Sequence, residues 1–447
     1  FSIGSQAMKL GGSISSGRTI FRIGLISLCF VSGILTGRAL DFSTTNVNAL
    51  NRFYALLESS NRPVTVLSFG DSMADSYRSP TYHVMQKLVN RFGIAGFSLN
   101  NYRNSAVWTL ESGATSRGPD YFWYNAYSSV PPGGAVWWNN LTSPGGIWAD
   151  RVGVFYISQT NGGSFRLMIS TNNSPWETAL TLDGYSVIPQ GHFATVTLPL
   201  NRYRVRIESD SGTNFIIGPS VLDTATNGIH AAFTDWGGIA LNQVTNVPLS
   251  IREPIFAALQ PDLIVWHMKE PVESLATWME ACEAWWQNSA PDGDVLYLGT
   301  TWISVDTNTT TTIDQNTIVR TIALEHNRAY VDLMTPSISY QWLVDQGYMQ
   351  DPTHVNPAGG LFCANIIWSD LGLFAVGENR RINLQPLGNQ MQLSYQTSTN
   401  ARYRLEISSD LKTWTPIFTN PVVNATFTTN FTPETAPTFY RLNLTAP

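Results

Sequence analysis

The sequence predicts an α/β protein with a doubly wound parallel sheet, an inserted β-rich segment and a second β-rich segment at the end. Three observations predict this fold class. Strand-like runs alternate with helical patterns in two separate stretches. Between those stretches, residues 100–227 are rich in Gly, Asn, Thr, Ser and Trp and contain short alternating runs. From residue 377 onward the pattern is β-like again.

Residues 40–99 are predicted to form the first part of the α/β domain. The apolar run Val64–Phe69 indicates a buried strand and leads directly into Gly70-Asp71-Ser72. A helical pattern follows over Tyr82–Phe92. We therefore expect a strand–turn–helix unit, with a helix N-terminus close behind Ser72.

Residues 100–227 are predicted to form an antiparallel β-sandwich inserted into that domain. Turn clusters such as Asn161-Gly162-Gly163 separate its short alternating runs, a spacing typical of a sandwich. The runs are Val152–Ile157, Phe165–Ile169, Ala194–Leu198 and Tyr203–Ile207.

The α/β alternation then returns over residues 228–376, which are predicted to complete the domain. Four strand-like runs are Gly228–Phe233, Leu263–Met268, Val295–Gly299 and Ala329–Leu333. Helical patterns lie between and after them, at Val247–Leu259, Ser274–Gln287, Ile313–His326 and Pro357–Leu371. Strands that alternate with helices in this way favour a parallel sheet.

Residues 377–447 are predicted to form a small, separate β-sandwich. Its strand-like runs are Gln392–Tyr395, Tyr403–Ile407 and Phe439–Leu442. The stretches Tyr403–Trp414 and Phe439–Leu442 resemble fibronectin-III-like modules appended to exported enzymes. That resemblance implies a spacer or attachment role.

The N-terminal residues 1–39 are predicted to be a leader and signal peptide. Lys9, Arg18 and Arg22 precede the apolar run Ile23–Leu35, and small or flexible residues follow up to Ala39. This pattern is typical of a secretory signal cleaved after Ala39, and the alternative is an uncleaved anchor. We expect a secreted, periplasmic or cell-surface bacterial protein that has no membrane segment after cleavage.

Composition excludes some partners. The 447-residue chain has a formal net charge of −6 and no block of Lys and Arg, which disfavours nucleic-acid binding. Cys282 and Cys363 lie in apolar helical patterns and are expected to be buried, with one disulfide as the alternative. No histidine pair has metal-ligand spacing, so we predict neither a metal nor an organic cofactor.

Three residues carry the predicted chemistry. Ser72 lies at the carboxyl end of the first predicted strand, where open α/β sheets bind ligands. A serine hydroxyl needs a base to become nucleophilic. His354 is the candidate base, and Asp351 is placed to orient and stabilise its ring. Ala74 replaces the second glycine of a Gly-x-Ser-x-Gly elbow, which argues against an α/β-hydrolase.

These stretches resemble the SGNH or GDSL hydrolases. Four blocks match: Val66–Ser72, Gly228–Gly238, Pro261–Trp266 and Asp351–Gly359, with Ala329–Leu333 similar to the strand before the last block. The resemblance implies a flavodoxin-like doubly wound sheet and a Ser-His-Asp mechanism. It also implies an oxyanion hole built from the backbone N–H groups of Ser72 and Gly238. A different register would put Ala240 in the place of Gly238.

The sequence departs from this family after the third strand. Family members carry Gly-x-Asn there, and the Asn side chain donates to the oxyanion, but this chain has Met268-Lys269-Glu270-Pro271. His267 lies near that position, although strand alternation could equally bury it in the helix layer. We list Asp71, His267 and Glu270 as possible substrate-binding residues.

The insert points to a carbohydrate substrate. Bacterial enzymes of this family that act on acetylated sugars can carry a carbohydrate-binding-like sandwich at this position. Tryptophans of the insert either stack on sugar rings or fill its core: Trp108, Trp123, Trp137, Trp138, Trp148 and Trp176.

We therefore predict a secreted serine esterase that removes acyl groups, acetyl above all, from a carbohydrate. The alternatives are a glycan-binding or surface protein on a degenerate scaffold and an acyltransferase acting on a sugar. The acyl group, the sugar and the oligomeric state do not follow from the sequence.

Overall fold

The computed structural model describes residues 44–59, 62–74, 77–99, 108–117, 127–138, 148–171, 174–235, 237–304 and 311–373, together with strands between 383 and 445. The predicted signal peptide, residues 1–39, lies outside the described residues and stays a prediction. In this part of the chain, no helix combines the length and the apolar character needed to cross a membrane.

The central sheet is parallel, as the alternation of strands and helices predicts. Its strands are β1 (Val64–Gly70), β2 (Ile94–Ser98), β12 (Ile229–Asp235), β13 (Leu263–His267), β14 (Asp294–Leu298) and β15 (Ala329–Val331). They lie in the order β15-β14-β13-β1-β12-β2, each parallel to its neighbour. Apart from β2, which is added at one side, this is the 2-1-3-4-5 order of doubly wound folds.

Helices cover both faces of this sheet because successive strand residues point to opposite sides. Val66 joins one core cluster and Leu67 the other. The first face is covered by α1 (Asn51–Ser59), α2 (Pro80–Phe92) and α8 (Pro357–Asp370). The second face is covered by α3 (Leu241–Thr245), α4 (Leu249–Leu259), α5 (Val272–Ser289) and α6 (Thr311–Glu325). The short helix α7 (Tyr340–Asp345) precedes α8.

Cys282 and Cys363 lie on opposite faces of the sheet. Cys363 is buried in the first core and Cys282 in the second, and both are free. Their role as small buried hydrophobic residues agrees with the prediction, and the alternative of a disulfide does not hold.

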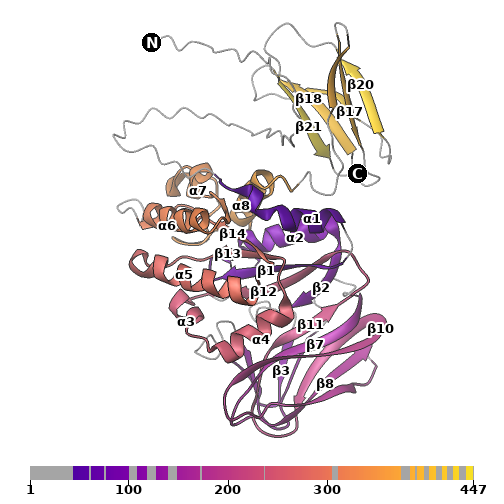
Figure 1. The fold of residues 1–447 in the computed structure, drawn as a ribbon, viewed down its shortest axis with the longest axis vertical. Coiled ribbons are helices and arrows are strands. Elements are labelled where there is room, and N and C mark those ends of the chain that lie inside the picture. The colour runs from indigo at the N-terminus through magenta and orange to yellow at the C-terminus, as the bar shows by residue number, and fades with distance from the viewer. Residues whose placement is uncertain are drawn as a thin grey trace. The chain divides into compact units, whose positions relative to one another are not determined.

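The inserted segment continues the parallel sheet. Strand β11 (Asn214–Leu222) pairs antiparallel with β2, with Ser220 opposite Ser98, and β7 (Trp148–Ser158) and β10 (Gln190–Ser209) follow. Figure 1 shows this succession from β1 through β2 and β11 to β7. The other strands of the insert are β3 (Trp108–Glu111), β4 (Thr115–Arg117), β5 (Tyr127–Val130), β6 (Ala135–Trp138), β8 (Ser164–Thr171) and β9 (Glu177–Asp183).

One long strand links two antiparallel sheets of the insert. The sequence predicts separate strands at Ala194–Leu198 and Tyr203–Ile207, but both belong to β10. The first half of β10 pairs with β7 and the second half with β6 and β8. The register shifts between Thr197 and Asn201, around Pro199, which has no N–H to donate to a ladder.

The C-terminal strands form two three-stranded antiparallel sheets, ordered β16-β17-β20 and β19-β18-β21. Their bounds are β16 (Asn383–Leu387), β17 (Gln390–Gln396), β18 (Arg402–Ser408), β19 (Thr415–Thr419), β20 (Thr426–Phe431) and β21 (Phe439–Thr445). The three predicted runs fall in β17, β18 and β21. The likeness to fibronectin-III modules and the domain boundaries stay predictions.

Candidate active site

The turn that carries Ser72, the predicted nucleophile, begins where β1 ends, and we call Asp71–Ala74 the nucleophile turn. The Asp71 carbonyl accepts the Ala74 N–H at 3.1 Å, and Asp71 Oδ1 accepts the Met73 N–H at 2.8 Å. Glycine is required just before this turn, because a Cβ on Gly70 would lie 2.1 Å from the His267 carbonyl oxygen. Strand β13 can therefore approach the nucleophile closely. Ser72 is partly exposed at the top of the turn.

The prediction of a helix N-terminus directly behind Ser72 is wrong. Helix α2 begins at Pro80, where the fixed φ of proline suits a first helical position. Ser79 caps it, since Ser79 Oγ accepts the Tyr82 N–H at 3.1 Å. The backbone N–H groups next to Ser72 therefore belong to a turn.

The base is held by a tight turn before α8. The Asp351 carboxylate accepts the backbone N–H groups of Thr353 and His354, both at 2.8 Å. The Gln350 N–H donates to the His354 carbonyl at 2.9 Å. These bonds let an aspartate and a histidine three positions apart meet through their side chains as well.

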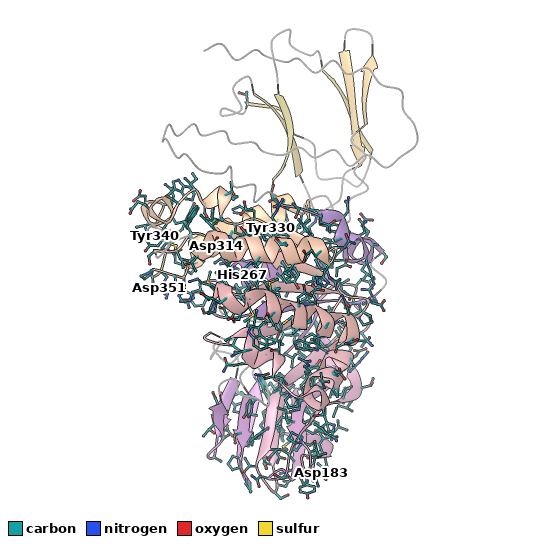
Figure 2. The ribbon with its side chains drawn as sticks, turned by 60° about the vertical axis from the view of Figure 1, so that its left-hand side comes forward. Asp183, His267, Asp314, Tyr330, Tyr340 and Asp351 are labelled. Carbon is teal, nitrogen blue, oxygen red and sulfur yellow. The ribbon has the colours of Figure 1, made fainter. Side chains whose placement is uncertain are left out.

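The fold brings Ser72, His354 and Asp351 together as predicted. His354 Nε2 lies 2.8 Å from Ser72 Oγ, across 282 positions of sequence. His354 Nδ1 lies 2.9 Å from Asp351 Oδ2. The carboxylate fixes the proton on Nδ1, so Nε2 is left to accept the serine proton. In Figure 2, Asp351 lies at the edge of the α/β ribbon.

Asp351 stays ionised in this arrangement. Partial burial raises its pKa, but the hydrogen bonds from the Thr353 and His354 N–H groups and from the His354 ring outweigh burial. The pKa of Asp351 therefore lies below its ordinary value. An ionised carboxylate beside Nδ1 is the arrangement that stabilises an imidazolium, which the predicted role of His354 as a base requires.

The three predicted substrate-binding residues lie beneath the site. Asp71 and Glu270 are each 6 % exposed and His267 is 1 % exposed. The Asp71 carboxylate accepts the Lys269 N–H, and the Glu270 carboxylate accepts the Leu241 N–H. Figure 2 labels His267 within the α/β part of the ribbon. All three side chains are buried in the ligand-free structure, and their role in substrate binding stays a prediction. Burial also lowers the pKa of His267 to about 4, so its ring is neutral.

Hydrogen bonding in the turn after β12 distinguishes Gly238 from Ala240 as the candidate oxyanion donor. The Ala240 N–H already donates to Gln243 Oε1 at 2.9 Å. Gly238 is exposed and has a φ of +88°, which favours glycine. Gly238 is therefore the remaining candidate from this turn.

Two hydrogen bonds that hold the turns of the site leave no signal in the sequence. The Lys269 N–H donates to Asp71 Oδ2 at 3.0 Å, and Gln315 Nε2 donates to the Met268 carbonyl at 3.0 Å. Each contact joins elements that are far apart in the chain. In the described residues, no group of three or more His, Cys, Asp or Glu side chains is placed to hold a metal ion.

The tryptophans of the insert divide between core and surface. Trp138 is buried, whereas Trp148 is 49 % exposed, with the Arg202 guanidinium 5.2 Å from its ring centre. The Arg204 guanidinium lies 5.1 Å from the ring centre of Trp137 and 4.7 Å from that of Trp176. Trp123 and the side chain of Trp108 lie outside the described residues. Arginine is thus a ring partner of three of the predicted stacking residues.

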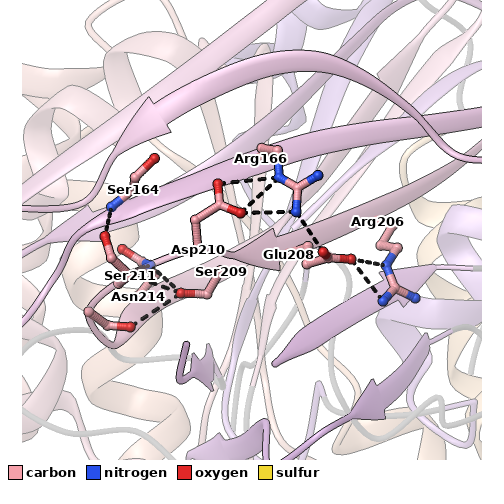
Figure 3. A network of polar contacts seen from close by, with 9 residues as sticks. Ser164, Arg166, Arg206, Glu208, Ser209, Asp210, Ser211 and Asn214 are labelled. Carbon is pink, nitrogen blue, oxygen red and sulfur yellow. Dashed lines mark hydrogen bonds and ion pairs between the residues drawn. The ribbon is translucent and has the colours of Figure 1, made fainter. Parts of the chain in front are cut away.

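Neighbouring charges on this part of the insert also bind one another. Figure 3 shows Arg166 joined to Glu208 and Asp210, at 2.6 and 2.9 Å, and Arg206 joined to the same Glu208 at 3.0 Å. The Arg166 pairs connect β8 with Glu208 at the end of β10 and with Asp210 just after it, whereas the Arg206 pair lies within β10.

Comparison with solved structures identifies the fold. A structure described as "Peptidoglycan O-acetylesterase in action, 5 min" matches with a TM-score of 0.55 and 14 % identity, over 75 % of this chain and 98 % of that one. A putative GDSL-like lipase from Parabacteroides merdae matches with a TM-score of 0.28 and 15 % identity, over 32 % and 74 %. A family two carbohydrate esterase from Cellvibrio japonicus matches with a TM-score of 0.26 and 10 % identity, over 60 % and 99 %.

Only the first of these likenesses is strong enough to carry an argument, and at that identity it concerns the fold alone. The chain shares the α/β fold of that structure, and its membership of the family that its motifs resemble stays a prediction. The sequence matches no protein-family model and no curated protein.

Proposed function

We propose that the chain is a serine esterase that removes acyl groups, acetyl above all, from a carbohydrate. One observation carries the proposal: the His354 ring joins Ser72 Oγ at 2.8 Å and the Asp351 carboxylate at 2.9 Å. A nucleophile, a base and a group that orients the base form the constellation required for acyl transfer through serine. The partly exposed Ser72 leaves room for an ester.

The reaction proceeds in two halves. Ser72 Oγ attacks the ester carbonyl while its proton passes to His354 Nε2. The Ser72 and Gly238 N–H groups hold the negative oxygen of the tetrahedral intermediate. The bond from carbon to the sugar oxygen then breaks, and Nε2 returns the proton to that oxygen. Water repeats the sequence on the acyl-serine, giving the free acid and Ser72.

The carbohydrate and the site of action belong to this proposal. The insert between β2 and β12 supports a sugar substrate, and we interpret its two antiparallel sheets as a carbohydrate-binding-like sandwich. The solved structure that matches with a TM-score of 0.55 is named as a peptidoglycan O-acetylesterase. The N-terminal pattern of a basic region and an apolar run supports export of the enzyme.

The test compares wild type with Ser72→Ala on p-nitrophenyl acetate and on acetylated polysaccharide. Ser369→Ala is the matched control, because Ser369 is an exposed serine of α8. We expect wild type and the control to release acetate and Ser72→Ala to fall by about 10³-fold or more. Equal rates for Ser72→Ala and wild type would overturn the proposal.

A second function is favoured by one departure in the site. Glu270 and Pro271 lie where the family resemblance implies an Asn-containing turn, and neither offers an N–H donor from its side chain. A scaffold that binds glycan without hydrolysis would explain this loss. Retention of acetylated glycan by wild type and Ser72→Ala alike, with no acetate released by either, would support that function. Transfer of acetyl to an added sugar, with little free acetate, would identify an acyltransferase.

A further inference from the structure

The turn that follows β13 is held by hydrogen bonds from three other parts of the chain. Gln315 Nε2 of α6 donates to the Met268 carbonyl at 3.0 Å. The Lys269 N–H donates to Asp71 Oδ2 at 3.0 Å, and Glu270 Oε1 accepts the Leu241 N–H at 2.5 Å. We call Met268–Glu270 the β13 turn. The β13 turn is therefore hydrogen-bonded to α6, to the nucleophile turn and to the start of α3.

Two of these contacts involve buried carboxylates, and burying a carboxylate costs free energy. Burial, with a smaller contribution from Glu270, raises the pKa of Asp71 to about 7 despite its bonds from the Met73 and Lys269 N–H groups. Burial likewise raises the pKa of Glu270, against its bond from the Leu241 N–H. A carboxylate out of water is stabilised only by strong hydrogen bonds, and here backbone N–H groups supply them. Both acids stand in turns next to the proposed reacting atoms.

Glu270 fixes one end of the turn that carries Gly238. Leu241 begins α3 directly after residues 237–240. The other end of that turn follows Asp235, which lies opposite Gly70 in the sheet and accepts the Ser68 hydroxyl at 2.9 Å. Between these two fixed points, Gly238 has its positive φ and the Ala240 N–H is taken by Gln243.

We propose that Glu270 is a positioning residue for the oxyanion pocket. Its carboxylate accepts the Leu241 N–H and so joins the turn that carries Gly238 to the β13 turn. Asp71 joins the nucleophile turn to the same β13 turn through the Lys269 N–H. The inference rests on the proposed serine-esterase function and deepens it. The two N–H groups assigned to the oxyanion, of Ser72 and Gly238, come from separate loops. A shared anchor fixes the distance between those loops before substrate binds, which is what stabilisation of a developing negative charge requires.

The test measures kcat and KM of Glu270→Ala and Glu270→Gln with p-nitrophenyl acetate. Alanine removes the acceptor of the Leu241 N–H, whereas the glutamine amide oxygen can replace it. We expect Glu270→Ala to lower kcat by about 10- to 100-fold with KM within about twofold, below the full cost of one lost oxyanion donor. Glu270→Gln should regain most of the loss. Wild-type kcat in Glu270→Ala, or equal damage in both variants, would overturn the inference.

Glu273→Ala is the matched control, because Glu273 is an exposed glutamate in the first turn of α5. It should leave kcat unchanged. If Glu270→Ala does not fold, Glu270→Asp takes its place, since a carboxylate one methylene shorter falls short of Leu241. A kcat loss at constant KM supports the inference in that variant, and wild-type kcat contradicts it.

Amide hydrogen exchange separates failure of the inference from failure of the proposed function. Peptides that cover residues 237–245 should exchange faster in Glu270→Ala than in wild type, whatever the protein catalyses. If Ser72→Ala hydrolyses esters like wild type, the esterase proposal falls, and exchange still reports the anchor. If Ser72→Ala is inactive while Glu270→Ala has normal kcat and normal exchange, only the positioning role falls.

Discussion

At the scale of single residues, His354 joins two groups that the sequence places very differently. Asp351 is a local partner in the same turn, whereas Ser72 arrives from the end of β1. The local pair fixes the ring tautomer, and the fold of the sheet brings the serine to the other ring nitrogen. The contribution of each partner can therefore be measured separately.

Asp351→Asn should lower kcat on p-nitrophenyl acetate by about 10²- to 10⁴-fold, and His354→Ala by at least as much. Asparagine keeps the shape of the turn but removes the charge that stabilises imidazolium. Exposed Asp345 of α7 gives the control, Asp345→Asn, which should be silent. A loss smaller than about threefold in either triad variant would argue against the assigned roles.

Asp71 predicts a dependence of stability on pH. Its pKa is raised to about 7 by burial, so between its ordinary value of 3.8 and about 7 the folded protein binds more protons than the unfolded chain. The contribution of Asp71 to the free energy of unfolding therefore falls as pH rises through that window and levels off above it. Asp71→Asn lacks this titration.

Urea unfolding of both proteins from about pH 4 to about pH 8 checks the sign. The free energy of unfolding of wild type minus that of Asp71→Asn should decrease toward neutral pH. A difference that stays constant, or that increases with pH, would show that Asp71 ionises normally in the folded protein.

At the scale of elements, the start of α8 sets the place of the base. Asn356 caps this helix, since its Oδ1 accepts the Gly359 N–H at 3.0 Å and its Nδ2 donates to the Gly347 carbonyl at 2.6 Å. The cap thus ties the helix to the loop behind the His354 turn. Gly70 helps to set the place of Ser72, because the absence of a side chain there lets β13 approach the nucleophile turn.

Asn356→Ala should lower the free energy of unfolding by about 1 kcal/mol, the usual value of an N-cap. It should also reduce kcat by several-fold, because His354 lies two residues earlier. Asn365→Ala, at an exposed position of the same helix, is the control. Unchanged urea midpoints for both variants would contradict the capping role.

The elements that the sequence reveals are those with a strong local pattern. Val64–Phe69 is a continuous apolar run, and Pro357 marks the start of α8 correctly. Strand β2 escapes prediction because it is short and contains Gly96. The contact of Glu270 with Leu241 also escapes, because it depends on how α3 packs and leaves no periodic signal in the sequence. The triad could be predicted since each of its parts lies at a strand or helix end.

At the scale of the whole domain, the inserted segment shares a sheet with the α/β part. Strand β11 pairs with β2, and the start of β10 meets α4, where Ser250 Oγ donates to the Pro189 carbonyl at 2.8 Å. The sequence predicts an insert by its change of pattern, and the bounds of that insert stay a prediction. It cannot show this continuity, because edge pairing depends on strands more than a hundred positions apart.

Continuous pairing predicts that the insert and the α/β part unfold together. Amide exchange in increasing urea should give β7 and β11 the same unfolding free energy as β1 and β12. Independent units would instead show a plateau in which the strands of the insert exchange while β1 remains protected. That plateau would contradict a shared cooperative sheet.

The identity of the nucleophile is tested most directly with a fluorophosphonate, an ester-hydrolase probe that reacts with activated serines. The measurement is the site at which this probe modifies the full chain. Peptide mass spectrometry should find one modification, on Ser72, in wild type and in Ser369→Ala. The same treatment of His354→Ala should leave Ser72 unmodified, because only the bound imidazole activates it. Labelling spread over other serines, or equal labelling of Ser72 without His354, would contradict the account.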